Sequence, residues 1–403
     1  MRRILGFWFI LLFAVSAYGK GTGPLIAKHE IQQKIITDIK GRTVEKADRY
    51  LQKEPVTVTA SISERSAGGP NDFYSEGDYW HPDPDDPDAP FIQKDGIRFE
   101  GRFEDDRLAM RRFAEITAAL TSAWILTGEQ KYADHALVHM KAWFNNPETM
   151  MNPDMLYAQA IMGRVTGRSI GLIDAYHLIE VAQSARVLSE THAIPVEEAK
   201  RIKNWFGRFI TWMTTHEYGL QEMVHPNNHS TTWAVTAGTM ARLVGHNEIL
   251  ELCRDRFKYV LLPDQMDLEG RFPREIDRTK PYGYSLFNMD AFANLAQVLS
   301  TKDENLWEYV THDGKSLQLG MDFIAPYIDD KSAWPYGEDV DIWDKWPVRH
   351  SLLLFAGLAY ENPEYIDLFL EQDPEPTHEE VLRNHPVRHP IIWMEELFMD
   401  MDL

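Results

Sequence analysis

The residues of this chain best suited to chemistry lie in two short segments about fifty positions apart. Residues 225–230 read His-Pro-Asn-Asn-His-Ser and place the amide of Asn228 beside the imidazole of His229. In the second segment, Arg278 precedes Tyr284 by six positions. Asn, protonated His and Arg donate hydrogen bonds to a carboxylate, and a tyrosine phenol can give up and return a proton. These groups suit the movement of a proton on a carbon next to a carboxylate.

One reaction that needs this set is β-elimination from a 4-linked uronate. The C5 carboxylate must be neutralised by preorganised donors, a base must remove the C5 proton, and an acid must protonate the leaving O4. Positive charge nearby would lower the tyrosine pKa from its ordinary value of about 10, so that one phenol could act as base and then as acid. Taken singly, the same residues also suit structural roles, such as a helix cap at Asn227 or Asn228.

Composition and the first residues exclude several classes of protein. The formal charge of −21 argues against a nucleic-acid partner, which needs a basic face. Met1-Arg2-Arg3 and the apolar run to Ala17 read as a signal peptide over residues 1–19, with a run too short to span a membrane. We expect a secreted or periplasmic protein that is not inserted in the membrane. The single cysteine, Cys253, allows no intramolecular disulfide and no lipid attachment after the apolar run.

Apolar residues recur at steps of three and four through most of the chain, which predicts helices. The clearest segments are 108–126, 132–144 and 199–213, the last behind Pro195. Further helices are predicted at 170–179, 232–244, 249–261, 286–299 and 352–360. Successive amphipathic helices with short connections pack as antiparallel pairs, and no fixed repeat favours an open solenoid. We therefore expect an all-α fold, an incomplete α/α toroid, forming one domain over residues 20–403.

The main interruption is a segment of about residues 66–106, which carries little helical signal. Four prolines between positions 82 and 90 exclude a helix or a central strand there. A long ordered loop in a compact domain is often a lid or a binding loop. The aromatic pair Tyr79-Trp80 favours a loop that packs on a ligand or on the domain.

Five segments, in the same order along the chain, resemble the alginate lyase superfamily of uronate-cleaving α/α toroids. These are residues 79–84 (Tyr-Trp-His-Pro-Asp-Pro), 156–174, the Asn227-Asn228-His229 core, the Arg278-to-Tyr284 segment, and 346–349 (Trp-Pro-Val-Arg). The resemblance implies that Asn228, His229 and Arg278 hold the carboxylate and that Tyr284 is the acid and base, with Tyr282 as the alternative. It further implies sugar contacts from Gln159 on a central helix, from Arg349, and from Tyr79 and Trp80. His81 replaces a usual Trp, and Ser230 stands where Gly is common.

The resemblance implies elimination without a metal, and the sequence contains no metal-ligand spacing or cofactor motif, so we expect neither. The expected partner is an acidic polysaccharide: alginate first, glucuronan or another β-1,4-uronate as the alternative. Two other classes stay open. An inverting glycoside hydrolase could use carboxyls such as Glu222 and Glu275 but would leave the Asn-His and Arg-Tyr groups idle. A non-catalytic glycan-binding protein would keep the aromatic and basic residues without needing Tyr284 to ionise.

Overall fold

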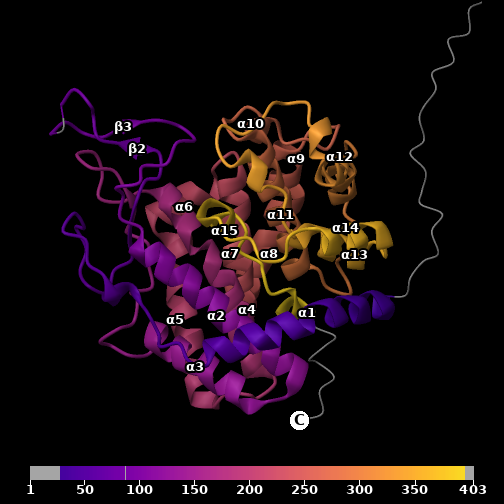
Figure 1. Cartoon of the computed structure of the whole chain (residues 1–403), viewed down its shortest axis with the longest axis horizontal. Helices are drawn as coiled ribbons and strands as arrows, with labels where there is room; N and C mark the ends of the chain where they lie inside the picture. Colours follow the sequence, from indigo (N-terminus) through magenta and orange to yellow (C-terminus); the bar gives the residue numbers. More distant parts are fainter. Residues whose placement is uncertain (1–27, 87, 395–403) are drawn as a thin grey trace, which may run out of the picture.

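A computed structural model describes residues 28–86 and 88–394 of the chain. The predicted signal peptide lies outside the described residues. No helix of the part described is long and apolar enough to cross a membrane. Figure 1 shows helices throughout the body of the molecule and a set of irregular segments with short strands at one side. The helices are α1 Lys28–Tyr50, α2 Asp105–Thr127, α3 Gln130–Phe144, α4 Leu178–Glu190, α5 Val196–Thr215, α6 Glu217–Met223, α7 Asn228–Val244, α8 Asn247–Arg256, α9 Leu262–Gln265, α10 Pro273–Ile276, α11 Pro281–Leu299, α12 Leu317–Asp329, α13 Ser351–Ala359, α14 Pro363–Glu371 and α15 Glu379–Arg383.

The longer helices alternate along the chain between two layers. Helices α2, α4, α7, α11 and α13 are buried on nearly every side, and each packs against the next of the series. Helices α1, α3, α5, α12 and α14 bury one apolar stripe and expose the rest, as amphipathic outer helices do. In α5, for example, the buried positions are 199, 202, 205, 206, 209, 210 and 213. An inner layer wrapped by an outer one is the arrangement of an α/α toroid.

The predicted helices at 108–126, 132–144 and 199–213 are confirmed as parts of α2, α3 and α5. The predicted helix at 170–179 is wrong in type and position. A 3₁₀ helix, η2, covers Ser169–His177, and α4 begins only at Leu178. Gly171 lies so close to the Ala158 backbone that a Cβ would come within 2.5 Å of the Ala158 carbonyl oxygen. This tight approach of the segment to its neighbour explains the irregular turn.

The segment around Gln159 corrects a second expectation. Residues Tyr157–Ala160 form strand β4, not a helix, and pair in parallel with β1, Tyr74–Glu76. The Gln159 backbone N–H donates to the Ser75 hydroxyl at 2.8 Å, and Gln159 itself has a φ of 51°, which no α-helix allows. The strand holds the long loop against the helical body.

Among the described residues of the predicted loop, 66–86 and 88–104, none belongs to a helix. Its outer part is a small antiparallel pair, β2 Trp80–His81 with β3 Ile92–Gln93, which projects from the body in Figure 1. Phe99 packs edge-on against Phe91 and lies against the His81 ring. The loop is therefore held by its own aromatic residues and is ordered around Trp80.

Candidate active site

The start of α7 positions the Asn-His pair. Asn227 caps the helix by accepting a hydrogen bond from the His229 N–H. Asn228 is buried, and both its backbone N–H and its side-chain amide donate to the Glu275 carboxylate at 2.8 Å. His229 is partly exposed, and its Nδ1 lies 2.5 Å from Glu222 Oε1. The carboxylate of Glu222, on α6, thus fixes the imidazole and leaves Nε2 as the nitrogen available for a ligand.

The start of α11 positions the phenol. Tyr284 lies one turn inside the helix, and its hydroxyl is 3.0 Å from the Tyr79 hydroxyl and 3.4 Å from Arg278 Nη2. The Arg278 guanidinium lies over the Tyr284 ring, with Cζ 4.6 Å from the ring centroid. Arg278 also donates to Asp95 at 3.1 Å. The long loop therefore contacts this cluster twice. Its Tyr79 contacts the Tyr284 phenol, and its Asp95 binds Arg278.

The other candidate tyrosine points away from this cluster. Tyr282 is fully buried, and its hydroxyl donates to the Tyr327 carbonyl at 2.9 Å. Its ring packs against Trp334 and Trp343. Of the two tyrosines, Tyr284 is therefore the one placed beside Arg278.

The pKa of Tyr284 departs from the expectation drawn from the sequence. Burial raises it above the ordinary value, while the charges of Arg278 and Arg383 and the hydrogen bond from Tyr79 oppose the rise. Burial wins, so the phenol is protonated at neutral pH. The Tyr284 phenol of the free protein therefore carries its proton.

Two cations of the cluster were missed in the sequence because no motif marks them. Arg383, on α15, forms an ion pair with the buried carboxylate of Asp78. Lys280 is buried, lies 3.3 Å from Glu380 Oε1 and places Nζ 5.7 Å from the Tyr79 ring centroid. Arg383 is a hundred residues beyond Tyr284 in sequence, so only the fold brings its charge to the phenol.

His225, which we did not assign from sequence, also lies here. Its ring centroid is 4.8 Å from that of His229, and its Nδ1 lies 2.6 Å from Asn227 Oδ1. Burial and the neighbouring His229 lower the pKa of His225. The neutral ring is a further polar group beside the His229 imidazole.

Gln159 and Trp80 form a second group that extends from the loop. The Gln159 side chain donates to Asp174 at 3.3 Å and accepts from Arg168 Nη2 at 3.0 Å. Two guanidinium groups lie near the Trp80 ring, with Cζ of Arg164 5.2 Å and Cζ of Arg168 6.0 Å from the ring centroid. An aromatic face flanked by cations suits a sugar ring that carries a carboxylate.

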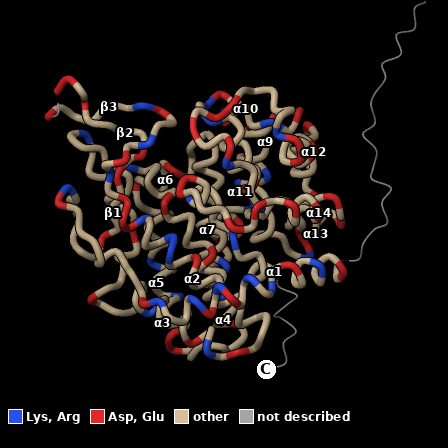
Figure 2. The backbone as a smooth tube through the Cα atoms, viewed as in Figure 1, with Lys and Arg blue, Asp and Glu red and all other residues tan. Residues whose placement is uncertain are grey.

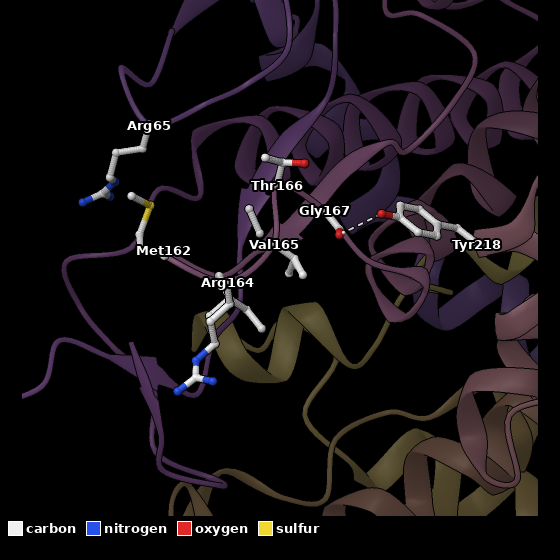
Figure 3. A pocket seen from close by; sticks show the side chains of 10 residues that line it. Arg65, Met162, Arg164, Val165, Thr166, Gly167 and Tyr218 are labelled. Carbon is white, nitrogen blue, oxygen red and sulfur yellow. Dashed lines mark hydrogen bonds between the residues drawn. The ribbon is translucent and has the colours of Figure 1, made fainter. Parts of the chain in front are cut away.

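A groove with a volume of about 470 Å³ opens beside this group. It is lined by residues 160–167 together with Arg65 and Tyr218, and Figure 3 shows the Arg164 guanidinium at its rim. The Tyr218 hydroxyl donates to the Gly167 carbonyl at 3.1 Å and so joins α6 to the turn after β4. Helix α6 also carries Glu222, so one short helix borders both the groove and His229.

The structure does not bring Arg349 to either group. Its guanidinium donates to Asp38 and to the Leu370 carbonyl, both at 2.6 Å, and covers the Phe369 ring at 5.1 Å. These contacts tie α1 to α14. The segment resembles a sugar-binding one in sequence, but here its arginine closes the outer layer, so we do not retain it as a substrate contact.

The comparisons with known proteins agree with this fold. The alginate lyase family matches residues 57–334, well over half of the chain. An α/α-toroid polysaccharide lyase, an enzyme that breaks a carbon–oxygen bond, is thus the class that the fold and the match define. The chain belongs to the alginate lyase family.

Solved structures give the same result. An alginate lyase from Bacteroides ovatus is 26% identical, with a TM-score of 0.77 over 91% of this chain and 95% of that one. Alginate lyase A1-III from Sphingomonas species A1 is 15% identical, with a TM-score of 0.50 over 78% and 85%. A variant of A1-III complexed with a tetrasaccharide is 14% identical, with a TM-score of 0.51 over 76% and 80%. No curated protein matches the chain. The predicted α/α toroid is confirmed.

Proposed function

We propose that this enzyme cleaves 1,4-linked uronate polymers, alginate first, by metal-independent β-elimination that leaves unsaturated oligosaccharides. The observation that carries the proposal is the meeting of the Tyr284 hydroxyl with Arg278 and Tyr79, with the Asn228-His229 pair on α7 as the second half of the site. Membership of the alginate lyase family supports it. The chain's acidity is no obstacle: Figure 2 shows acidic and basic residues interspersed along the backbone, and a cleft can be positive locally.

Arg278 is the residue that receives the substrate carboxylate. In the free protein it pairs with Asp95, and both side chains are about one-third exposed, at 31% and 34%. An exposed ion pair contributes little stability, so a uronate carboxylate can replace Asp95 at small cost. Arg can hold that carboxylate through two N–H groups and withdraw charge from it as the C5 proton leaves. Asn228 contributes less directly, since one of its amide hydrogens is committed to Glu275.

The proton transfers divide between Tyr284 and His229. With its raised pKa, Tyr284 holds the proton that the leaving O4 requires. The hydrogen bond to Glu222 keeps the Nδ1 proton on His229 and presents the Nε2 lone pair as a base. This pair suits guluronate, where the C5 proton and O4 lie on opposite faces of the ring. On mannuronate or glucuronate the two lie on one face, and Tyr284 must ionise first, aided by the charges of Arg278 and Arg383.

Trp80, Tyr79 and Gln159 bind the sugar chain, with the loop of residues 66–106 as a lid over it. The lid residue Tyr79 already touches the catalytic phenol, so closure of the loop and completion of the site are one event. We propose further that residues 1–19 direct the protein to the periplasm or outside the cell, where acidic polysaccharides are met.

The test is to supply polymannuronate, polyguluronate and glucuronan separately and to follow the ultraviolet absorbance of the new double bond. Absorbance on either alginate block supports the proposal, and the preferred block shows which proton route dominates. Activity on glucuronan alone would keep elimination but change the substrate. New reducing ends without absorbance would indicate a hydrolase, and binding without any product would indicate a glycan-binding protein.

A further inference from the structure

Three metal-ligand side chains that are far apart in sequence meet in the core, away from the residues assigned above. Asp290 lies in the middle of α11, His350 directly precedes α13, and His385 follows α15. All three are buried, with exposed fractions of 1%, 0% and 3%. One ligand atom from each lies within 4.8 Å of the others, and this is the one such trio among the residues that the structure describes.

Each side chain of this trio has at least one polar atom without a hydrogen-bond partner within the described chain. Asp290 Oδ1 accepts from the Ser351 hydroxyl at 2.9 Å and the Leu352 N–H at 2.8 Å, but Oδ2 accepts from nothing. Both ring nitrogens of His350 and Nδ1 of His385 are equally unpartnered. A buried polar atom without a partner destabilises the fold. Three side chains with such atoms at one place call for a bound species that contacts one atom of each.

The side chains at this place favour a cation over a water molecule. Asp290 forms no ion pair with any residue in the described part of the chain, and the groups that hydrogen-bond to its carboxyl group are uncharged. A buried carboxylate is found paired with a cation or bound to a metal ion. The two histidine side chains beside it add nitrogen ligands for such an ion.

We propose that Asp290, His350 and His385 bind a divalent transition-metal ion, zinc by ligand type. Two imidazoles and one carboxylate are ligands that zinc prefers, and a fourth ligand can be a water molecule. An ion equidistant from atoms 4.8 Å apart would lie about 2.8 Å from each, so each ligand must move inward by less than about 1 Å to reach a Zn–N or Zn–O distance of about 2.0–2.2 Å.

The surroundings orient these ligands as outer groups do in metal sites. The two hydrogen bonds hold Oδ1 of Asp290 and leave Oδ2 without a partner, and the Trp346 ring stacks on His350 with 26° between the planes. The ion would tie α11 to the segment that follows α15. Helix α11 carries Tyr284, and α15 carries Arg383. Its role is therefore structural, and the proposal does not depend on the substrate assigned above.

The test is the metal content of the purified full chain, prepared without a histidine tag and measured by inductively coupled plasma mass spectrometry. We expect about one zinc per chain, lost in His350→Ala and Asp290→Asn. The matched control is His177→Gln, because His177 is also a buried histidine with an unpartnered Nδ1 but lies outside the trio. That variant should keep its zinc even if it is less stable.

A second measurement on the wild-type protein keeps the proposal testable if the variants fail to fold. Chelator-treated protein should melt about 3–5 °C lower and recover on addition of zinc alone. Cobalt added to the same apoprotein should give the visible absorption of a four-coordinate site. Wild-type protein that contains no metal, shows no shift in melting temperature with zinc and gives no cobalt spectrum would overturn the proposal and leave a water-filled polar site.

Discussion

Replacing Tyr284 with Phe separates catalysis from folding at the candidate site. The change removes one hydroxyl, with its contacts to Tyr79 at 3.0 Å and Arg278 at 3.4 Å, and keeps the ring under the guanidinium. Loss of such hydrogen bonds costs about 1–2 kcal/mol of unfolding free energy. Loss of the proton donor should lower kcat by roughly 10²–10⁴, which corresponds to about 2.7–5.4 kcal/mol of transition-state stabilisation. The kinetic loss should therefore exceed the stability loss.

Tyr282→Phe is the matched control, because it removes a hydroxyl from the same helix two residues away. That hydroxyl donates to the Tyr327 carbonyl in the core, so its loss should lower the melting temperature and leave kcat nearly unchanged. Both variants would be assayed by ultraviolet absorbance on alginate, by thermal unfolding and by oligosaccharide binding. A Tyr284→Phe enzyme with near-normal kcat, or two variants with equal kinetic losses, would refute the assignment of the phenol.

Four further outcomes follow from the structure. Trp80→Ala should raise KM at least about tenfold with little change in melting temperature, because the ring is half-buried in the loop. A large drop in melting temperature with an unchanged KM would instead make Trp80 a core residue. Arg349→Ala should lower the unfolding free energy by about 1–3 kcal/mol and leave KM unchanged, since the guanidinium binds Asp38 and the Leu370 carbonyl. A raised KM would show that Arg349 contacts the substrate. Turnover well below the melting temperature should survive exhaustive chelation; loss that one added metal restores would end the metal-free mechanism. Turnover on polymannuronate should rise about tenfold per pH unit from 7 to 9, because the Tyr284 pKa is raised and the phenolate fraction grows with pH; a plateau below pH 8 would exclude the phenolate.

The sequence predicted the helices best where one face is apolar. The spacing in α3 and α5 marks the face that packs inward, and both segments were found nearly at their bounds. The inner helices α7 and α11 are buried all round, so apolar periodicity alone placed their starts too late, although the possible cap at Asn227 or Asn228 had marked the start of α7 correctly. Their beginnings are set by a cap at Asn227 and by Pro281 in the first turn. Strand β4 was not predicted, because four residues are too few to show an alternation of apolar and polar side chains and their pairing partner, β1, is distant in sequence.

The site residues that lie close together in the sequence could be predicted, whereas those that only the fold brings together could not. Asn228, His229, Arg278 and Tyr284 lie in two short segments, and each segment folds as the start of one helix, so their types and spacing were informative. The sequence did not predict that the pKa of Tyr284 is raised, because this shift depends on how much protein covers the ring. Arg383 reaches the phenol only because α15 lies against it.

The ion pairs of the site show how an acidic protein can bind an acidic polymer. Asp78 is buried among Arg102, Arg107 and Arg383. Burial alone would raise the pKa of Asp78, but the charges of Arg107, Arg383 and Arg98 hold it below its usual range. Breaking a buried pair leaves an uncompensated charge and costs about 3–5 kcal/mol, so these arginines are not available to a ligand. Arg278 differs, because its partner Asp95 is part of the loop and about one-third exposed. A uronate carboxylate that displaces Asp95 gains that cation without breaking a buried ion pair. The net charge of the chain therefore does not oppose binding, since the cation that the substrate needs is held by a carboxylate that it can replace.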